Sequence, residues 1–459
     1  QRRFSSIPQF RATLHLLQER IPRVAVVSAD HAQMVDVRAV VETTETPIRV
    51  YDTGDTPAPA VQLLSNGRYR VMLTNAGGGY SRWRDLAVTR WREDTTCDPW
   101  GTFCFVRDID AARVWSVTWQ PVLAPPDFYE AIFTESHVEY RRHDGPIHTH
   151  VDVAVSPEDD IELRRVRLIN RSRVRHTIEF TTYAEVVIAP PPADAAQRGF
   201  SNLFVQTQIV AERDAVVCTR RPRSKGEVPP WMLHVVKVRG GSQVTTFETD
   251  RARFLGRGNT LADAAALGAG AELSGSDGPV LDPAVAVRHR VVLESDQTIT
   301  IDVVTGIADN RDACFALVDK YQDRALADRV FDLAWTHSHV ALRQINVTEA
   351  DAQLYGRLAG RILYANASLR ADAALIASNR RNQTGLWGYA ISGDLPILLL
   401  KIRDSSGIAL ARQLVQAHAY WRMKGVMVDL VIWNDDRGGY RQELHDQIMG
   451  LIAASIEDN

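Results

Sequence analysis

Residues 383–396, QTGLWGYAISGDLP, hold the most suggestive chemical groups in the C-terminal part of the sequence. Trp387 and Tyr389 precede a short ISGD segment whose carboxylate, Asp394, is followed by Leu-Pro. A carboxylate held in a loop can accept hydrogen bonds from two sugar hydroxyls and so fix a hexose ring. The alternative is that Asp394 caps a helix that starts near Pro396. The sequence alone leaves both interpretations open.

A second candidate site lies in NAGGGYSRWR, residues 75–84, where three consecutive glycines stand beside Tyr80, Ser81 and Trp83. Glycine lets backbone approach a ligand closely, aromatic faces pack on sugar C–H surfaces, and a serine hydroxyl can bond to sugar hydroxyls. We therefore predict that these three side chains bind substrate together with Trp387, Tyr389 and Asp394. The alternative is a tight β-turn whose aromatic residues belong to the core.

Two acidic stretches could supply a general acid. The SPEDD segment, residues 156–160, contains Glu158, although such a segment is typical of a solvated turn. The second stretch, VIWNDDRGGY at 431–440, carries Asp435 after Trp-Asn. Neither stretch is sufficient by its spacing alone.

Two His-x-His pairs raise the question of a metal. His148 and His150 would share one face of a strand, but no third ligand with suitable spacing accompanies them. His337 and His339, in a helical pattern, point about 200° apart. We predict no metal site.

The bulk composition excludes several classes of function. Lys plus Arg total 53 and Asp plus Glu total 56, which gives a net charge of -3. The composition therefore lacks the excess of positive charge that is typical of proteins binding nucleic acid or an anionic membrane. No stretch reaches the roughly 18 to 20 apolar residues of a membrane span, and the N-terminal part lacks a signal-peptide core. The four cysteines are too scattered for a disulfide framework, which favours a reducing, cytoplasmic compartment. The near balance of positive and negative charges is compatible with a neutral sugar as substrate.

The elements that must position these groups follow from the apolar spacing. Residues 1–60 begin with a helical pattern and continue into a Pro- and Thr-rich connector. Apolar residues then recur with period two through the region 61–307, which predicts a large antiparallel sandwich. After Asp309 the period becomes helical, with four helices readable around 326–341, 354–363, 408–424 and 444–452. The chain starts at Gln1 and ends in IEDN directly after a helical pattern, so we expect an excerpt of a longer protein.

Several long stretches resemble a known family. They include QRRFSS, LLQERIPRVA, QLLSNGRYRVMLTNAGGGYSRWRDLAVTRWRED, VSPEDDIELRRVRLINRS, ETDRARFLGRGNT, GLWGYAISGDLPI and HAYWRMKGVMVDLVIWND. Together they resemble the C-terminal half of bacterial cyclic β-1,2-glucan synthases and, more broadly, the cellobiose and chitobiose phosphorylases of glycoside hydrolase family ninety-four. The resemblance to the synthases is the stronger one, because QRRFSS and LLQERIP look like a junction after an upstream module.

The resemblance implies a multidomain β + α fold. Its parts would be a galactose mutarotase-like super-β-sandwich over 61–307, a helical linker over 308–350, and the first part of an (α/α)6 barrel over 351–459, which we expect to be truncated. In the family's phosphorylases one Asp protonates the leaving oxygen while inorganic phosphate attacks the anomeric carbon with inversion. One carboxylic acid then suffices, whereas an ordinary inverting hydrolase needs two.

The resemblance also implies roles for particular residues. Asp394 matches the family carboxylate that binds hydroxyls of the sugar in the donor subsite. The phosphorylases place an Arg six residues earlier, where this sequence has Gly388. Trp433, Asn434 and Asp435 imitate the letters of the family's general-acid motif but stand too close to Asp394. We therefore expect no catalytic residue in this chain, with the general acid and the phosphate ligands beyond Asn459.

We expect, from this resemblance, a segment of an enzyme that transfers glucosyl groups to or from phosphate on β-1,2-glucan and helps to set glucan chain length. The segment alone would be inactive. No cofactor is expected, with inorganic phosphate as co-substrate of the full-length enzyme. The expected partners are β-1,2-glucan or gluco-oligosaccharide, the remainder of the parent polypeptide and a second copy in a homodimer, in the cytoplasmic part of an inner-membrane synthase. The alternative is a non-catalytic carbohydrate-binding and dimerisation module.

Overall fold

The computed structural model describes residues 48–240, 244–436 and 443–457. The helix that we predicted near the start of the chain lies outside these residues. The connector predicted after it is described only from Ile48 onward and contains one short strand, Arg49–Tyr51.

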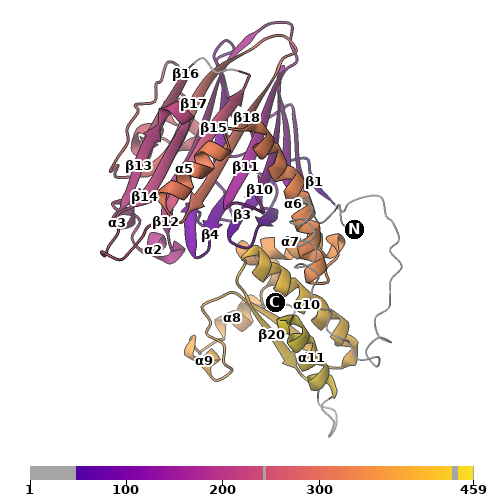
Figure 1. Cartoon of the computed structure of the whole chain (residues 1–459). Coiled ribbons are helices and arrows are strands. Elements are labelled where there is room, and N and C mark those ends of the chain that lie inside the picture. Colours follow the sequence, from indigo (N-terminus) through magenta and orange to yellow (C-terminus); the bar gives the residue numbers. More distant parts are fainter. Residues whose placement is uncertain (1–47, 241–243, 437–442, 458–459) are drawn as a thin grey trace, which may run out of the picture. The chain divides into compact units, whose positions relative to one another are not determined.

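Two antiparallel sheets of nine strands each contain most of the strands (Figure 1). The first sheet has the spatial order β1 (Arg49–Tyr51), β8 (Phe128–Phe133), β9 (Val138–Asp144), β10 (Ile147–Val155), β11 (Ile161–Asn170), β18 (Thr298–Ala308), β15 (Trp231–Arg239), β14 (Ala215–Arg220) and β13 (Val205–Val210). The second sheet has the order β16 (Val244–Asp250), β17 (Pro283–Leu293), β12 (His176–Ala189), β5 (Leu86–Thr89), β4 (Gly79–Trp83), β3 (Tyr69–Thr74) and β2 (Val61–Ser65), with β6 (Phe103–Asp108) on β12 and β7 (Arg113–Ser116) on β6.

The two sheets pack face to face around one apolar core. Strand β10 shows the cause, because Ile147, Val151 and Val153 point to the same side of the strand and are buried in the core shared with the second sheet. Val106 and Phe180 of the second sheet and Ile301 of the first have no exposed surface. The antiparallel sandwich predicted from period-two spacing is therefore confirmed.

The helices follow or interrupt the strands. They are α2 (Pro191–Ala196), α3 (Arg198–Asn202), α4 (Arg251–Leu255), α5 (Arg311–Lys320), α6 (Arg324–Gln344), α7 (Glu349–Leu363), α8 (Ala373–Ala377), α9 (Thr384–Trp387), α10 (Ile408–Lys424) and α11 (Glu443–Glu457). The four helices read from the apolar spacing are confirmed as α6, α7, α10 and α11. Side chains of Asn310 and Asp323 cap α5 and α6, whose apolar faces cover the outer surface of the first sheet.

A parallel pair of strands follows α9, where we had expected a helix. β19 (Ile397–Ile402) pairs with β20 (Asp429–Asn434), and α10 connects the two strands. Leu400 and Ile402 alternate onto one face and are buried against α10 and α11. The prediction of a helix starting near Pro396 is therefore wrong, because the ILLLKI run buries every second residue and pairs with a strand about 30 residues later.

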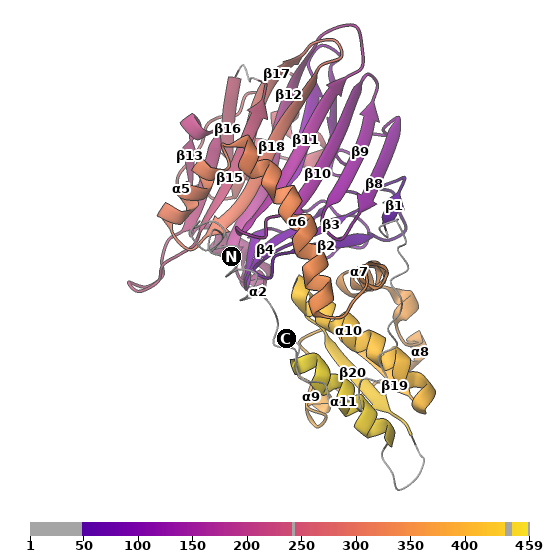
Figure 2. The ribbon, with the colours of Figure 1, turned by 45° about the vertical axis from the view of Figure 1, so that its right-hand side comes forward.

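Helix α7 and helix α10 attach the C-terminal part to the sandwich. Thr348 begins α7 with a capping box, and the helix packs on β2. Trp421 of α10 is fully buried and donates a hydrogen bond to the carbonyl of Tyr355, 2.9 Å away. At the end of α10, Lys424 forms a buried ion pair with Glu135 of the sandwich, with 2.5 Å between Nζ and Oε1. Figure 2 shows α7 and α10 beside the β2–β3 end of the sandwich.

Two absences can be stated for the described residues. The four cysteines are all free thiols. Among the helices of residues 48–457 that the structure describes, none combines the length and apolarity needed to cross a membrane.

Candidate functional site

The Asp394 loop, which we define as residues 383–394, is closed by its own polar groups. Oδ1 of Asp394 accepts a hydrogen bond of 2.9 Å from the side-chain nitrogen Nε2 of Gln383. The same nitrogen also donates to the backbone carbonyl of Ser392. Gly393 has a φ of 79°, a backbone conformation that favours glycine. Since no helix begins at Pro396, Asp394 is not a helix cap. It is an exposed carboxylate that is free on one side to accept further hydrogen bonds.

The two aromatic residues of the loop face solvent. Trp387 is 63% exposed and Tyr389 is 74% exposed. Large aromatic side chains normally bury 150–250 Å², so rings held this openly beside a carboxylate are typical of a ligand-contacting surface. The indole Nε1 of Trp387 donates to the carbonyl of Ser392 at 3.4 Å, which ties the ring to the loop.

A hollow of about 950 Å³ lies between the Asp394 loop and β20. Tyr389 and Ser392 line it from the loop, and Asp429, Trp433 and Asn434 line it from the strand. Trp387 and Asp394 are not among its lining residues. Ring faces beside hydroxyl, amide and carboxylate groups match the mixed surface of a hexose, which has C–H faces and a hydroxyl rim. The structure therefore assembles one candidate sugar site from two segments about 40 residues apart.

Asp435 forms an ion pair in the structure. Nζ of Lys401 lies 2.9 Å from Oδ2 of Asp435 and 4.3 Å from the centre of the Trp433 ring. That Asp435 is not the family's general acid stays a prediction. The sequence analysis considered Trp433 and Asn434 only as part of an acid motif. Their position beside Tyr389 depends on strand pairing, which no local signal reports.

Tyr80, Ser81 and Trp83 lie elsewhere, on β4, and they are 3%, 1% and 4% exposed. Ser81 donates a hydrogen bond to Glu162, and the indole of Trp83 donates to Asp160 at 2.7 Å. All three therefore pack as core residues, as the alternative interpretation held. They do not line the hollow beside the Asp394 loop. Direct contact of these three side chains with a sugar stays a prediction.

The glycines before Tyr80 serve this packing. A Cβ added to Gly79 would lie 1.8 Å from the carbonyl oxygen of Met72 on the neighbouring strand, and the φ of Gly79 is 154°. The close approach that glycine allows is here between two backbone segments.

The SPEDD segment forms ion pairs between the sandwich and the helices that follow it. Glu158 pairs with Arg329 of α6 at 2.6 Å, and Asp159 pairs with Lys320 of α5 at 2.6 Å. The hydrogen bond from Arg329 lowers the pKa of Glu158. A carboxylate with a lowered pKa is a poor proton donor near neutral pH, so Glu158 does not fit the role of a general acid.

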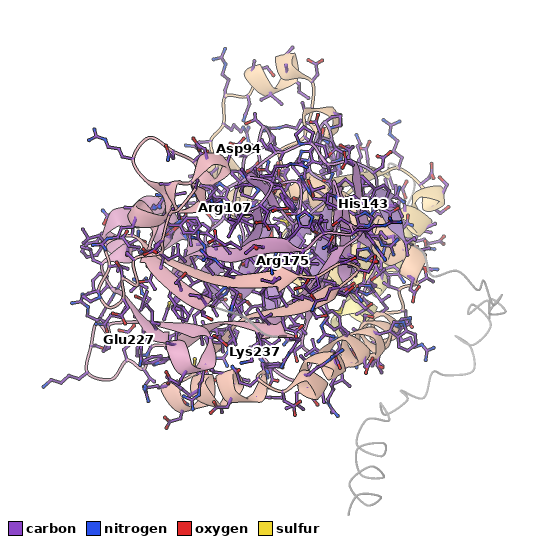
Figure 3. All side chains as sticks on the ribbon, turned by 90° about the horizontal axis from the view of Figure 1, so that it is seen from above. Asp94, Arg107, His143, Arg175, Glu227 and Lys237 are labelled. Atoms are coloured by element: carbon purple, nitrogen blue, oxygen red, sulfur yellow. The ribbon has the colours of Figure 1, made fainter. Side chains whose placement is uncertain are left out.

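The histidine pairs do not converge on a metal. His148 of β10 stacks on His143 of β9, which is labelled in Figure 3, with ring centres 3.7 Å apart and planes 12° from parallel. Burial lowers the pKa of both rings. In α6, His339 pairs with Glu349 at 2.5 Å.

One group in the described chain has metal-ligand geometry that the sequence analysis missed. Ligand atoms of His137, Glu139 and Asp152, on and beside β9 and β10, all lie within 4.8 Å of one another. Arg141 already binds Glu139 through two nitrogens, and Arg167 lies 2.5 Å from Asp152. A cation would have to compete with both guanidinium groups. The absence of a metal stays a prediction.

Comparison with known proteins fits this architecture. The sequence model described as "Glycosyl hydrolase 94, supersandwich domain" matches residues 44–324, which is more than half of the chain. The chain belongs to the glycosyl hydrolase 94 family. The matched region includes both sheets of the sandwich together with α5.

Three curated relatives match the chain, and the match to the first of them extends beyond the sandwich. The chain is 36% identical to "Cyclic beta-(1,2)-glucan synthase NdvB" of Rhizobium meliloti (strain 1021) over 443 residues, which is 96% of this chain and 16% of that protein. It is 28% identical over 136 residues to an N,N'-diacetylchitobiose phosphorylase of Vibrio proteolyticus, covering 28% of this chain and 17% of that protein. The corresponding enzyme of Vibrio furnissii is 24% identical over 285 residues, covering 60% and 34%. The chain thus spans 16% to 34% of the length of these relatives.

Proposed function

We propose that the chain belongs to a β-glucan-processing enzyme and that the hollow beside the Asp394 loop binds a glucosyl residue of β-1,2-glucan. The observation that carries the proposal is that the rings of Tyr389 and Trp433 line one hollow. Ser392 lines it too, and the exposed carboxylate of Asp394 stands two residues further along the chain. The similarity to a cyclic glucan synthase over 96% of the chain supports the substrate class.

In the proposed reaction, a phosphate oxygen bonds to the anomeric carbon while the glycosidic C–O bond breaks. An acid outside the described residues gives its proton to the leaving oxygen, and the configuration inverts. The reverse reaction transfers glucosyl from glucose 1-phosphate to a growing glucan. Such exchange would allow the enzyme to trim or extend chains, which is the proposed route to chain-length control.

Asp394 contributes binding rather than proton transfer in this scheme. Its exposed oxygen would accept hydrogen bonds from two hydroxyls of the glucosyl ring, while Gln383 holds the carboxylate in place. The proposed surroundings are an (α/α)6 barrel, of which α7, α10 and α11 would be part, in the cytoplasm.

The test is calorimetric titration of the chain with β-1,2-linked gluco-oligosaccharides. Asp394→Asn is expected to weaken binding about tenfold or more, since a charged hydrogen bond to the ligand is lost. Asp85→Asn is the matched control, because Asp85 is an exposed aspartate in the β4–β5 turn. Undiminished binding by the Asp394 variant would move the sugar site away from this loop.

A second candidate function is a non-catalytic carbohydrate-binding and dimerisation module. The exposed rings of Trp387, Tyr389 and Trp433 favour it, since they could bind a glucan without any acid. Sedimentation of the chain with and without oligosaccharide separates the two candidates. A stable dimer that binds glucan, carried by a parent polypeptide that releases no glucose 1-phosphate in the presence of phosphate, would favour the module.

A further inference from the structure

Three arginines line one cavity between the start of the sandwich and α7. Arg49 comes from β1, while Arg357 and Arg361 come from α7, and the remaining wall is mainly the segment 56–61. The cavity has a volume of about 300 Å³. Figure 2 shows β1 and α7 next to each other at this end of the sandwich. No residue of this cavity also lines the hollow beside the Asp394 loop.

Arg49 is buried without an anionic partner. It is 8% exposed, its Nε donates to the side-chain oxygen of Gln353 at 2.6 Å, and its Nη2 donates to the side-chain oxygen of Gln62. Nη1 is buried and has no hydrogen-bond partner. Burial lowers the pKa of Arg49, and the charge of Arg357 lowers it further. A buried guanidinium normally has a carboxylate to offset its desolvation.

The other buried arginines of the described chain use all three of their side-chain nitrogens. Arg90, Arg142 and Arg164 each donate to at least one carboxylate within the sandwich. Arg288 has no carboxylate partner, but its nitrogens donate to Thr181 and to the carbonyls of Ala266 and Ala271. Among these five arginines, only Arg49 combines the lack of a carboxylate with a buried nitrogen that has no acceptor, which indicates an anionic partner other than the described side chains.

The two arginines of α7 add to the unbalanced charge. Arg357 and Arg361 are four residues apart and therefore lie on one face of the helix, where like charges repel. Both are exposed, and neither forms an ion pair within the described part of the chain. Gly356, on the buried side of α7, lets the helix approach Arg49 closely, because a Cβ there would lie 2.8 Å from Nη2 of Arg49. A larger side chain would push the buried guanidinium away from the helix.

We propose that this cavity binds a small phosphate-type oxyanion, either free phosphate or the phosphate group of a sugar ester. A tetrahedral dianion can accept several N–H donors at once, and guanidinium groups match its oxygens in pairs. A single carboxylate would offset only one of the three positive charges. The volume admits the ion with room for a small organic group. The site is independent of the sugar hollow and of the function proposed for it.

The test uses the whole 459-residue chain and inorganic phosphate, titrated by calorimetry at constant ionic strength. The double variant R357Q/R361Q is expected to weaken phosphate binding about tenfold or more, and to abolish the rise in melting temperature that the bound anion causes. Both positions are exposed, so the variant leaves the packing between β1 and α7 in place. The matched control R173Q/R175Q changes two exposed arginines in the β11–β12 turn, where Arg175 is labelled in Figure 3, and should bind as the parent does.

Two further arms define the ligand and separate the proposals. Glucose 1-phosphate that binds more tightly than phosphate assigns the site to an ester, and equal or weaker binding assigns it to the free ion. Asp394→Asn should leave the phosphate affinity unchanged, whatever it does to oligosaccharide binding. The proposal is overturned if phosphate gives no saturable heat, or if R357Q/R361Q binds phosphate as tightly as R173Q/R175Q.

Discussion

The sandwich and the segment 365–399 differ in what their side chains do. In the sandwich, apolar residues such as Val106 and Phe180 have no exposed surface, and buried charges such as Arg142 are paired. In residues 365–399 no side chain is buried at all. That segment contains Trp387, Tyr389 and Asp394. Stability and the proposed ligand contact therefore lie in separate regions, as is common where a rigid scaffold holds a binding loop.

The largest expected difference between the two regions is in the loss of stability when one tryptophan of each is replaced by alanine. Trp115 of β7 is 2% exposed, and Trp115→Ala should lower the free energy of unfolding by about 3 to 5 kcal/mol. Trp387→Ala removes a 63% exposed ring and should change it by less than about 0.5 kcal/mol. Urea unfolding followed by circular dichroism measures both. Equal losses would show that the segment 365–399 is held by burial after all.

A smaller effect is expected at the junction of the two regions. Lys424→Ala leaves Glu135 buried and unpaired, which should cost about 3 kcal/mol. The comparison is Asp309→Asn, which breaks the exposed pair between Arg84 and Asp309 and should cost less than about 1 kcal/mol. If the two variants unfold at the same urea concentration, the buried pair does not anchor α10 to the sandwich.

Near pH 6, where His234 has only begun to contribute, the smallest expected effect is a dependence on pH that the sandwich should show. Burial and, to a smaller extent, the charge of Arg164 lower the pKa of His234 to about 3, while Thr182 and Thr305 hydrogen-bond the ring. The pKa of His234 in the folded state lies below the unfolded value of about 6.5. The contribution of the neutral, buried ring to the free energy of unfolding is therefore complete above pH 6.5 and is lost as the pH falls toward 3. The loss should reach up to about 1.4 kcal/mol per pH unit.

Urea unfolding at several pH values, compared between the parent and His234→Gln, measures this slope. Glutamine can still bond to both threonines but does not take up a proton in this range. His445→Gln, at an exposed histidine of α11, is the control and should keep the slope of the parent. An unchanged slope in His234→Gln would assign the dependence to other groups.

Local spacing was enough to predict much of the fold. The period-two apolar spacing within residues 61–307 predicted antiparallel strands, such as β18, and the apolar stripe of α7 predicted a helix, now seen to begin with a capping box at Thr348. A short apolar run such as 397–402 fits either a helix or a strand. Its partner β20 is separated from it by all of α10, so the correct choice depends on a contact that no window of the sequence contains.

The same limit applies to the candidate site. The sequence indicated the Asp394 loop, because aromatic rings and a carboxylate stand within eight residues. It could not place Trp433 beside Tyr389, since that contact requires β19 and β20 to pair. The sequence also could not predict that Tyr80 is buried in the core while Tyr389 is exposed to solvent. Both tyrosines follow glycine, and their burial is decided by which elements pack over them.

The unburied segment 365–399 also determines where a protease would act on the folded chain. Arg370, Arg380 and Arg381 are exposed there. Trypsin could therefore cleave the peptide bond that follows each of them without first unfolding the core. Cleavage would leave the sandwich and α7 on one product and the β19–α10–β20 unit on the other. The two products would still be held together by Trp421 and by the Lys424–Glu135 pair. A nicked chain of this kind would keep its scaffold while its backbone is cut just before the Asp394 loop.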